Sequence, residues 1–334
     1  MKKPTEPERN PFPYTDSNKR YHTYNYYLRR RYGGKCVKIP LDGGFSCPNI
    51  DGRAGYGGCI YCSARGSGDF TFPGLPVAEQ FRLQRERMGK KWETARCIPY
   101  LQSNTNTYAP VERLRALYDE ILALPDCVAF HIATRADCLP EEVTELLAEI
   151  SEKIDLTVEL GLQSVSDATA ERINRGHTFA DFLSAFSRLR REAPGARIAV
   201  HLIDGLPGED RDAMIGSAVT VGELRPDEIK FHLLDVLRGT ELHRLYSAGE
   251  YRPLEKEAYT EILVSQIERL DPRIVISRVT GDAPFSELVA PDYTRKKFTL
   301  MNAIDREFVR RDTYQGKKVV KTHKETENIS TSVD

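Results

Sequence analysis

The sequence predicts an α/β fold, a partial (βα)6 TIM-like barrel with N- and C-terminal extensions. Along most of the 334 residues, short strand-like apolar runs alternate with longer segments of helical periodicity, a pattern typical of parallel sheets. Six such units precede a change of pattern, which favours an open or partial barrel over a closed one. Polar residues and glycines follow the strand-like runs, and parallel α/β folds bind ligands at those strand ends.

The expected elements follow from apolar periodicity and from glycine and proline punctuation. Strands are expected at residues 36–41, 95–102, 127–133, 154–161, 197–203 and 228–234. Helices are expected at residues 77–88, 110–123, 140–150, 167–174, 179–191, 210–224, 241–247 and 254–270. Because both chain ends are polar, we expect a flexible arm at 1–18, the barrel at 19–320 with a C-terminal extension from about residue 253, and a disordered tail at 321–334.

The composition is that of a soluble globular protein. Hydrophobic residues make up 40% of the chain and charged residues 29%, and the net charge of -1 gives no attraction of the whole molecule to nucleic acid or membrane. Met1 leads into polar sequence, and no apolar run approaches the roughly 20 residues that span a bilayer. Seven cysteines, an odd number, fit a reducing compartment. We therefore expect a cytoplasmic protein without a membrane partner.

Basic residues crowd both ends of the chain, at 19–38 and at 295–321. They suit a bound polyanion, although solvated basic faces are the commoner explanation. Residues 21–32 interleave tyrosines with arginines, which suits either base stacking or the packing of a helix against the barrel. Residues 278–283 with 293–297 suit either the closing edge of the barrel or an RNA-facing surface.

Three cysteines, Cys47, Cys59 and Cys62, lie in one glycine-rich loop with the spacing Cys-x11-Cys-x2-Cys. Three thiolates so close in sequence can converge on one metal centre. A zinc site would need a fourth ligand, for which Cys36 or His22 is available, whereas a four-iron cluster on three cysteines leaves one iron open. The cluster is favoured, because structural zinc normally uses paired knuckles and the sequence has no second one.

Other strand ends carry further polar residues. Asn104, Thr105 and Asn106 follow the second expected strand and suit a carboxylate or an ammonium group. Cys138 follows the third, where it is either a buried thiol or a group that meets the substrate or donates a hydrogen atom. The strand histidines are interpreted as hydrogen-bonded core residues rather than ligands; they are His131, His201 and His232.

The cysteine loop, Glu159-Leu-Gly-Leu-Gln163-Ser, Asn174-Arg-Gly-His177 and Gly205-Leu-Pro-Gly208 occur in this order. The set resembles the radical S-adenosylmethionine (SAM) superfamily, in the branch of the elongator catalytic subunit and the oxygen-independent coproporphyrinogen oxidases. It most resembles an elongator-like bacterial family with the long cysteine loop, which includes a tRNA wobble-uridine modifying enzyme from bacilli. The resemblance covers roughly residues 20 to 320 and implies the radical SAM type of partial barrel.

The resemblance implies a role for individual residues. A 4Fe-4S cluster would be ligated by Cys47, Cys59 and Cys62. Tyr61 would pack beside adenine, and Cys138 would be a further candidate for catalysis. The remaining contacts with SAM would be made by Asn104, Thr105 and Asn106 to its amino group, Glu159 and Gln163 to the ribose, Arg172 or Arg175 to the carboxylate, and Leu202 to Gly205 with Leu233 to the adenine. The loop at Asn104 lacks the family's glutamate.

The resemblance also implies an activity. One electron, delivered by a donor such as a flavodoxin or a ferredoxin, would cleave SAM and release a 5'-deoxyadenosyl radical. The expected substrate is a tRNA base, at the wobble-uridine side chain. One alternative is a radical enzyme acting on a small metabolite or a porphyrin-like substrate, and another is a non-catalytic RNA-binding cluster protein. The sequence gives no sign of an acetyltransferase domain or of an oligomeric state.

Overall fold

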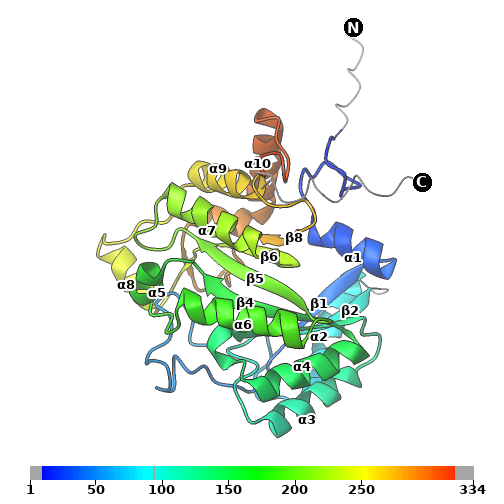
Figure 1. The fold of residues 1–334 in the computed structure, drawn as a ribbon. Coiled ribbons are helices and arrows are strands. Elements are labelled where there is room, and N and C mark those ends of the chain that lie inside the picture. The colour runs from blue at the N-terminus through cyan, green and yellow to red at the C-terminus, as the bar shows by residue number, and fades with distance from the viewer. Residues whose placement is uncertain (1–9, 93–94, 320–334) are drawn as a thin grey trace, which may run out of the picture.

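The computed structural model describes residues 10–92 and 95–319, and its centre is a seven-stranded parallel sheet (Figure 1). The strands lie side by side in chain order: β1 (Cys36–Leu41), β2 (Arg96–Leu101), β3 (Ala129–Arg135), β4 (Asp155–Gln163), β5 (Arg197–Asp204), β6 (Glu228–Leu233) and β8 (Val275–Val279). The edges β1 and β8 are not paired with each other, so the sheet is a partial barrel. The predicted fold class is confirmed.

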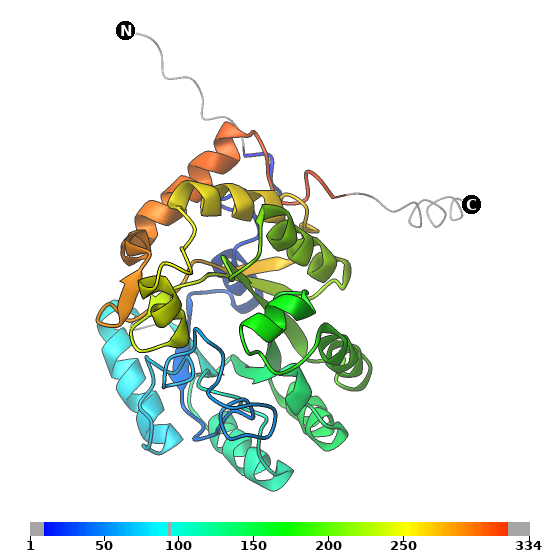
Figure 2. The ribbon, with the colours of Figure 1, turned by 90° about the vertical axis from the view of Figure 1, so that its left-hand side faces the viewer.

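Helices cover the outer face of the sheet, as Figure 2 shows looking along the barrel. They are α2 (Val77–Trp92), α3 (Val111–Leu122), α4 (Glu141–Lys153), α6 (Phe179–Glu192), α7 (Arg211–Glu223), α9 (Lys256–Ile267) and α10 (Lys297–Arg310). Two shorter helices, α5 (Asp167–Arg172) and α8 (Glu241–Ser247), lie at the carboxyl ends of the strands. Two short 3-10 helices, η1 (Ala136–Cys138) and η2 (Asp292–Lys296), and a small antiparallel pair, β7 (Val236–Leu237) with β9 (Leu288–Ala290), complete the described elements.

Strand β8 was not among the six predicted strands. It pairs with β6 and ends at Val279, so the segment around Arg278 is the closing edge of the barrel. The first role proposed for this segment, the closing edge of the barrel, is confirmed. The second, a surface that faces RNA, stays a prediction.

The helix α1 (Tyr24–Tyr32) precedes β1 and lies behind the centre of the ring in Figure 2. Tyr21 is buried and stacks on Phe308 of α10, with ring centroids 5.6 Å apart. The hydroxyl of Tyr24 lies 3.1 Å from Nε2 of His131 on β3. These tyrosines therefore pack α1 against the barrel, which is the second of the two roles that the sequence left open.

The basic residues at the two chain ends are largely paired with acids of the same chain. Within the described residues the pairs include Lys19 with Asp305, Arg29 with Asp16, Arg31 with Asp155, Lys297 with Asp282, and Arg310 and Arg311 with Glu307. The exposed ones, such as Arg29 with Asp16, contribute little to stability. They do lower the net positive charge that these ends present.

The described part of the predicted N-terminal arm, residues 10–18, has no helix or strand. Phe12 is nevertheless buried, and the side-chain amide of Asn10 donates to the carbonyl of Lys19 at 2.7 Å. Whether this arm is flexible stays a prediction. The expected tail at 321–334 lies outside the described residues.

Side chains along each strand alternate between the helix layer and the barrel interior. On β5, Ile198, Val200 and Leu202 join the apolar core under the helices, whereas His201 and Ile203 face inward. The inward positions of the neighbouring strands are mostly polar: Lys38, Tyr100, His131, Glu159 and Lys230. The apolar core thus lies between sheet and helices, and the interior is a polar compartment.

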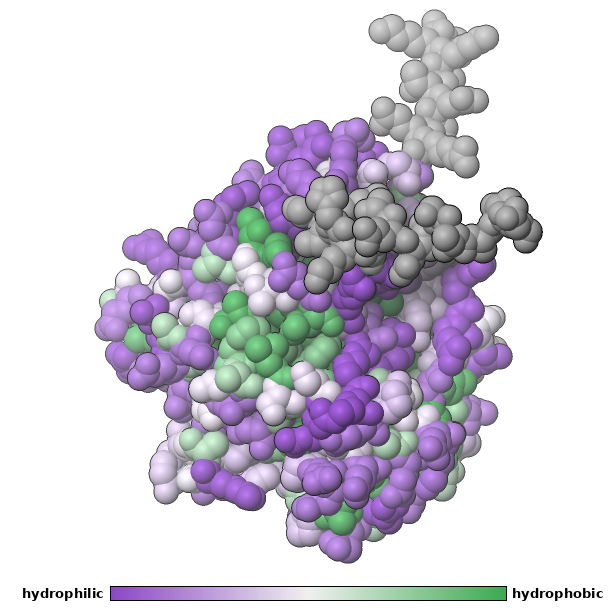
Figure 3. All heavy atoms as spheres, viewed as in Figure 1, coloured by the Kyte–Doolittle hydropathy of each residue, from purple (hydrophilic) through white to green (hydrophobic). Residues whose placement is uncertain are grey.

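The outer surface in Figure 3 is mostly hydrophilic, with one hydrophobic patch where Figure 1 shows β5 between α6 and α7. Among the described helices, none combines the length and the apolar character that crossing a membrane requires.

Asp204 at the end of β5 gives a pH-dependent prediction. Burial raises the pKa of this carboxyl from 3.8 to about 7, so the folded state binds its proton more tightly than the unfolded state does. Its stabilising contribution is complete below pH 3.8 and is lost as the pH rises towards 7. Asp204→Asn removes this loss, so its stability advantage over wild type should grow by about 2 kcal/mol between pH 5 and pH 8. Thermal unfolding at both pH values measures it.

The control for this prediction is Asp119→Asn, because Asp119 lies on the surface of α3 with half of its side chain exposed. This variant should track wild type at both pH values. An advantage of Asp204→Asn that is equal at pH 5 and pH 8 would contradict the assignment.

Candidate functional site

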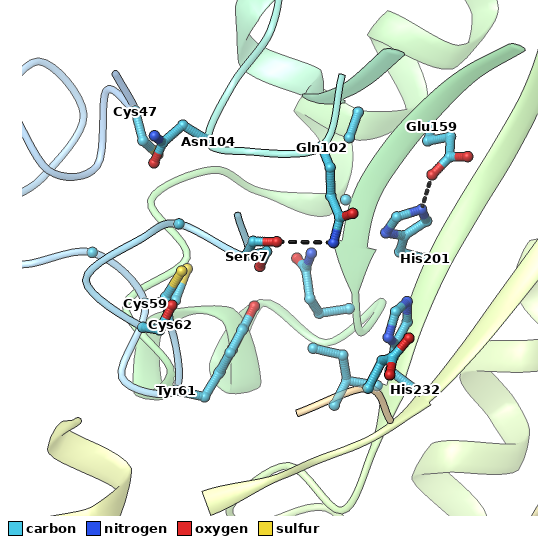
Figure 4. Close-up of a pocket in the computed structure, with 18 of the residues that line it drawn as sticks. Cys47, Cys59, Tyr61, Cys62, Ser67, Gln102, Asn104, Glu159, His201 and His232 are labelled. Atoms are coloured by element: carbon cyan, nitrogen blue, oxygen red, sulfur yellow. Dashed lines mark hydrogen bonds and ion pairs between the residues drawn. The ribbon is translucent and has the colours of Figure 1, made fainter. Parts of the chain in front are cut away.

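A pocket of about 280 Å³ lies at the carboxyl ends of the strands. Its wall is formed by the cysteine loop on one side and by the ends of β2 to β6 and β8 on the other. In Figure 2 the loop, coloured blue, lies in front of the strand ends. Figure 4 shows the thiols of Cys59 and Cys62 on the loop side, and Glu159, His201 and His232 across the pocket.

Asn49 and Asn174 hold the cysteine loop in place. The side-chain amide of Asn49 donates to the carbonyl of Asn174 and lies 3.7 Å from Sγ of Cys59. The amide of Asn174 in turn donates to the carbonyls of Tyr56 at 3.0 Å and Gly58 at 2.7 Å. The side chain of Asn49 fits against the cysteine loop because residue 55 is a glycine. A Cβ on Gly55 would lie 2.4 Å from Oδ1 of Asn49. Asn174, part of the Asn-Arg-Gly-His motif, is thus a brace for the cysteines.

The cysteine thiols are close enough to influence one another. Burial, together with the charges of Cys59 and Cys47, raises the pKa of Cys62 to about 12. Burial likewise raises the pKa of Cys59. Thiolates here require a cation to stabilise them, and metal binding releases such protons.

The arrangement disfavours a zinc site. Within the described residues, no three His, Cys, Asp or Glu side chains are placed to hold a single metal ion. The two proposed fourth ligands lie at the opposite edge of the sheet: Cys36 begins β1, ~17 Å of strand from its carboxyl end, and His22 adjoins the start of β8.

Two buried polar atoms at this pocket make no hydrogen bond among the described residues: Oγ1 of Thr105 and Nε2 of His177. Nη2 of Arg175 likewise makes no hydrogen bond, but it lies 3.6 Å from Oδ1 of Asp167. Arg175 is 1% exposed, and its guanidinium is fixed by the carbonyls of Ser164 at 2.6 Å and His177 at 3.0 Å. A cation held in this way, beside free donors, is suited to the carboxylate of a polar ligand.

The structure brings most of the predicted site residues together. Those lining the pocket are Cys47, Cys59, Tyr61, Cys62, Asn104, Thr105, Glu159, Gln163, Arg175 and Leu233. Of the two arginines proposed for a carboxylate, only Arg175 is among them. Arg172 is exposed, and its guanidinium donates to the carbonyl of Pro207 at 3.0 Å.

Four other predicted residues are not in the lining. Asn106 is buried and donates its amide to the carbonyl of Ala133 at 2.9 Å, as a brace between strands. Leu202 faces the helices, and its neighbour Ile203 lines the pocket instead. The carbonyl of Gly205 accepts from Tyr251 at 2.9 Å, and Cys138 is buried in η1. Contacts of these residues with a cofactor or substrate stay predictions.

Glu159 has an environment that the sequence did not reveal. The side chain is fully buried, and its carboxylate is bonded to Lys38 at 2.7 Å, His131 at 2.7 Å, His201 at 3.0 Å and also Lys230. The two lysines hold the pKa of Glu159 well below its usual range, although burial opposes them. The expected hydrogen bonds of His131 and His201 are confirmed. His201 and His232 nevertheless line the pocket, and Nε2 of His232 makes no hydrogen bond among the described residues. A contact of Glu159 with a ribose stays a prediction.

Sequence reasoning missed several lining residues, above all Tyr100, Gln102, Lys230 and Asp235. Gln102 donates to the carbonyl of Ser67 at 2.9 Å, a bond drawn in Figure 4. Strand alternation was the available signal. Residues two positions apart on a strand point to the same face of the sheet. Lys230 and His232 are two apart on β6, and Tyr100 on β2 is two positions before Gln102 in the loop that follows.

Two family models match the chain. The Radical SAM superfamily model covers residues 51–218, and the Radical_SAM C-terminal domain model covers residues 226–310. The chain belongs to the radical SAM superfamily. This family uses a 4Fe-4S cluster and SAM as cofactors, and the three loop cysteines, the fixed guanidinium of Arg175 and the unpartnered polar atoms beside it fit this pair of groups.

Two relatives match this radical SAM chain over most of its length, and a third matches about half of it. YtqA of Bacillus subtilis is 44% identical over 93% of this chain and 96% of its own length. YhcC of Escherichia coli K12 is 35% identical over 84% of this chain and 89% of its own length. A tRNA uridine(34) acetyltransferase of Methanocaldococcus jannaschii is 33% identical over 49% of this chain, which corresponds to 30% of the relative.

The solved structure of Methanocaldococcus infernus Elp3 with an N-terminal deletion resembles the fold, with a TM-score of 0.61 and 18% identity. The similarity covers 84% of this chain and 64% of the Elp3 chain. At this identity it supports the radical SAM partial barrel alone.

Proposed function

We propose that this radical SAM protein modifies a base of tRNA, at the side chain of the wobble uridine. The observation that carries the proposal is the similarity to a tRNA uridine(34) acetyltransferase of Methanocaldococcus jannaschii over 49% of the chain. The chain spans only 30% of that relative, so the proposal concerns the substrate and not the acetyl transfer.

The rim of the pocket supports a nucleic-acid substrate. Ile50 of the cysteine loop is 43% exposed and lines the pocket. Phe285 is 66% exposed, with the guanidinium of Arg295 at 5.7 Å from its ring centroid, and both line a hollow that shares Gly281 and Asp282 with the pocket. Exposed aromatics beside arginines stack unpaired bases, and an anticodon base is unpaired.

In this proposal the cofactors, when bound, supply a 5'-deoxyadenosyl radical through one-electron cleavage of SAM. Cys47, Cys59 and Cys62 would hold the cluster, and Arg175 with Thr105 would hold the polar end of SAM. Tyr61 packs in the same apolar cluster as Ile203, which would form a wall for the adenine. The strand ends exclude water from the reacting atoms. The electron would come from a small donor protein, such as a flavodoxin or ferredoxin, in the cytoplasm.

Salt-dependent tRNA binding tests the substrate class. Phosphate contacts make log K fall linearly with log salt, so affinity for unmodified tRNA should fall steeply between low and physiological salt. Arg53→Gln, which removes an exposed guanidinium from the cysteine loop, should reduce the slope by about one. Arg115→Gln, on the outer surface of α3 and paired with Glu149, is the control that should leave it unchanged. A small-metabolite enzyme would show weak, salt-insensitive association with tRNA, and that result would count against the proposal.

A further inference from the structure

A second cavity, of about 530 Å³, lies in the seam between the unpaired edge strands β1 and β8. We call it the seam cavity. It is lined from α1, β1 and α2 on one side and from β6 and β8 on the other. Its volume is in the range of pockets that bind small organic ligands.

The lining of the seam cavity is strongly cationic. Of the described residues that line it, five carry basic side chains and one an acidic side chain: Lys35, Lys38, Arg87, Lys230, Arg278 and Asp282. The carboxylate of Asp282 already has two basic partners: it bonds to Lys297 and lies 3.6 Å from Nη2 of Arg278. Its charge therefore does not balance those of Lys38 and Lys230.

Two of the lysines are packed close together. Nζ of Lys38 and Nζ of Lys230 each lie 4.8 Å from the ring centroid of Tyr100. Both reach the same carboxylate, that of Glu159. Burial, together with the charges of Lys38 and Arg278, lowers the pKa of Lys230 to about 7. The charge of Glu159 opposes this shift. One buried carboxylate thus serves two lysines, with Arg278 nearby, and an oxyanion in the cavity would relieve their repulsion.

The seam cavity adjoins the pocket at the strand ends. The two share Phe70, Tyr100, Gln102, Lys230, Arg278 and Asp282 in their walls. Lys230 and Arg278 therefore face both spaces, and an anion in the seam cavity lies next to a ligand in the pocket.

We propose that the seam cavity is a subsite for an oxyanion of the substrate, bound by Lys38, Lys230 and Arg278. As a subsite for the substrate this rests on the proposed function. The oxyanion is either a phosphate of the RNA next to the reacting base or a carboxylate carried by the base itself. The two share the chemistry of a compact oxygen anion that accepts hydrogen bonds from lysine and arginine.

The test is anion-dependent thermal unfolding of the full chain with its cluster reconstituted anaerobically. Chloride is replaced at constant ionic strength by inorganic phosphate in one series and by acetate in another. At least one of these anions should raise the unfolding temperature in a saturable way, because it binds the folded state. Saturation by phosphate and not by acetate supports the RNA phosphate, and the reverse supports a carboxylate.

Variants locate the effect. Arg278→Gln should weaken the apparent affinity for the anion about tenfold, the loss expected for one charge-assisted hydrogen bond. Its side chain is 29% exposed, so the variant is expected to fold, and Lys38→Gln serves as a second variant. Arg85→Gln, paired with Asp126, should bind as wild type does. Absence of saturation with both anions, or unchanged affinity in folded Arg278→Gln and Lys38→Gln, would overturn the subsite.

The two proposals can fail separately. Saturable anion binding that needs Arg278, in a protein that leaves tRNA unmodified, would reject the tRNA substrate and keep the anion site. Modified tRNA together with no saturable anion binding would reject the subsite alone.

Discussion

Replacement of Cys59 by alanine should abolish the cleavage of SAM and leave the barrel folded. A four-iron cluster on three thiolates loses one of its three protein ligands, whereas the loop that carries Cys59 lies outside the apolar core. Formation of 5'-deoxyadenosine after anaerobic reconstitution and reduction should fall to background. Thermal unfolding of the cluster-free proteins should differ by no more than about 1 kcal/mol in stability.

The matched control is Cys127→Ala. Cys127 lies just before β3, and its backbone bridges to that of Cys97, at the amino edge of the sheet and away from the loop. This variant should still produce 5'-deoxyadenosine at the wild-type level. A Cys59→Ala protein that makes 5'-deoxyadenosine would refute the assignment of Cys59 as a cluster ligand.

Glu159→Leu should be the most destabilising single substitution in the barrel interior. Leucine removes the carboxylate that Lys38 and Lys230 share and leaves two lysines facing each other in a buried space. Breaking a buried charge network from one side costs about 3–5 kcal/mol. We expect a loss of that size in the free energy of unfolding, measured by denaturant titration of the cluster-free chain.

Glu149→Gln is the control for this second prediction, because Glu149 is an exposed partner of Arg115 on the helix layer. It should unfold at the wild-type denaturant concentration. If Glu159→Leu were as stable as Glu149→Gln, the carboxylate of Glu159 would not stabilise Lys38 and Lys230 in the folded protein.

The strand–helix order could be predicted because each strand is a short apolar run and each helix an amphipathic one, and both periods are visible in the sequence. β8 was missed for a physical reason. Its five residues, Val275–Val279, include Ser277 and Arg278, so an edge strand with polar positions resembles a loop. The cysteine loop could be predicted because three closely spaced thiols define a metal site locally.

Contacts between strands could not be predicted in the same way. Arg172 and Arg175 are three apart, and only the fold decides that one is exposed and the other 1% exposed in the pocket. Leu202 and Ile203 differ by one position, and that position decides which face each side chain takes. The partners of Glu159 come from four other strands, so they become neighbours only when the sheet curls.

The most direct test of the tRNA proposal is mass spectrometry of nucleosides from total tRNA of a strain that lacks this protein, compared with its parent. The account predicts that one modified wobble uridine disappears and that its precursor accumulates. Reintroducing the wild-type gene should restore the modified nucleoside, and the Cys59→Ala gene should not. An unchanged nucleoside profile in the deletion strain would contradict the central claim.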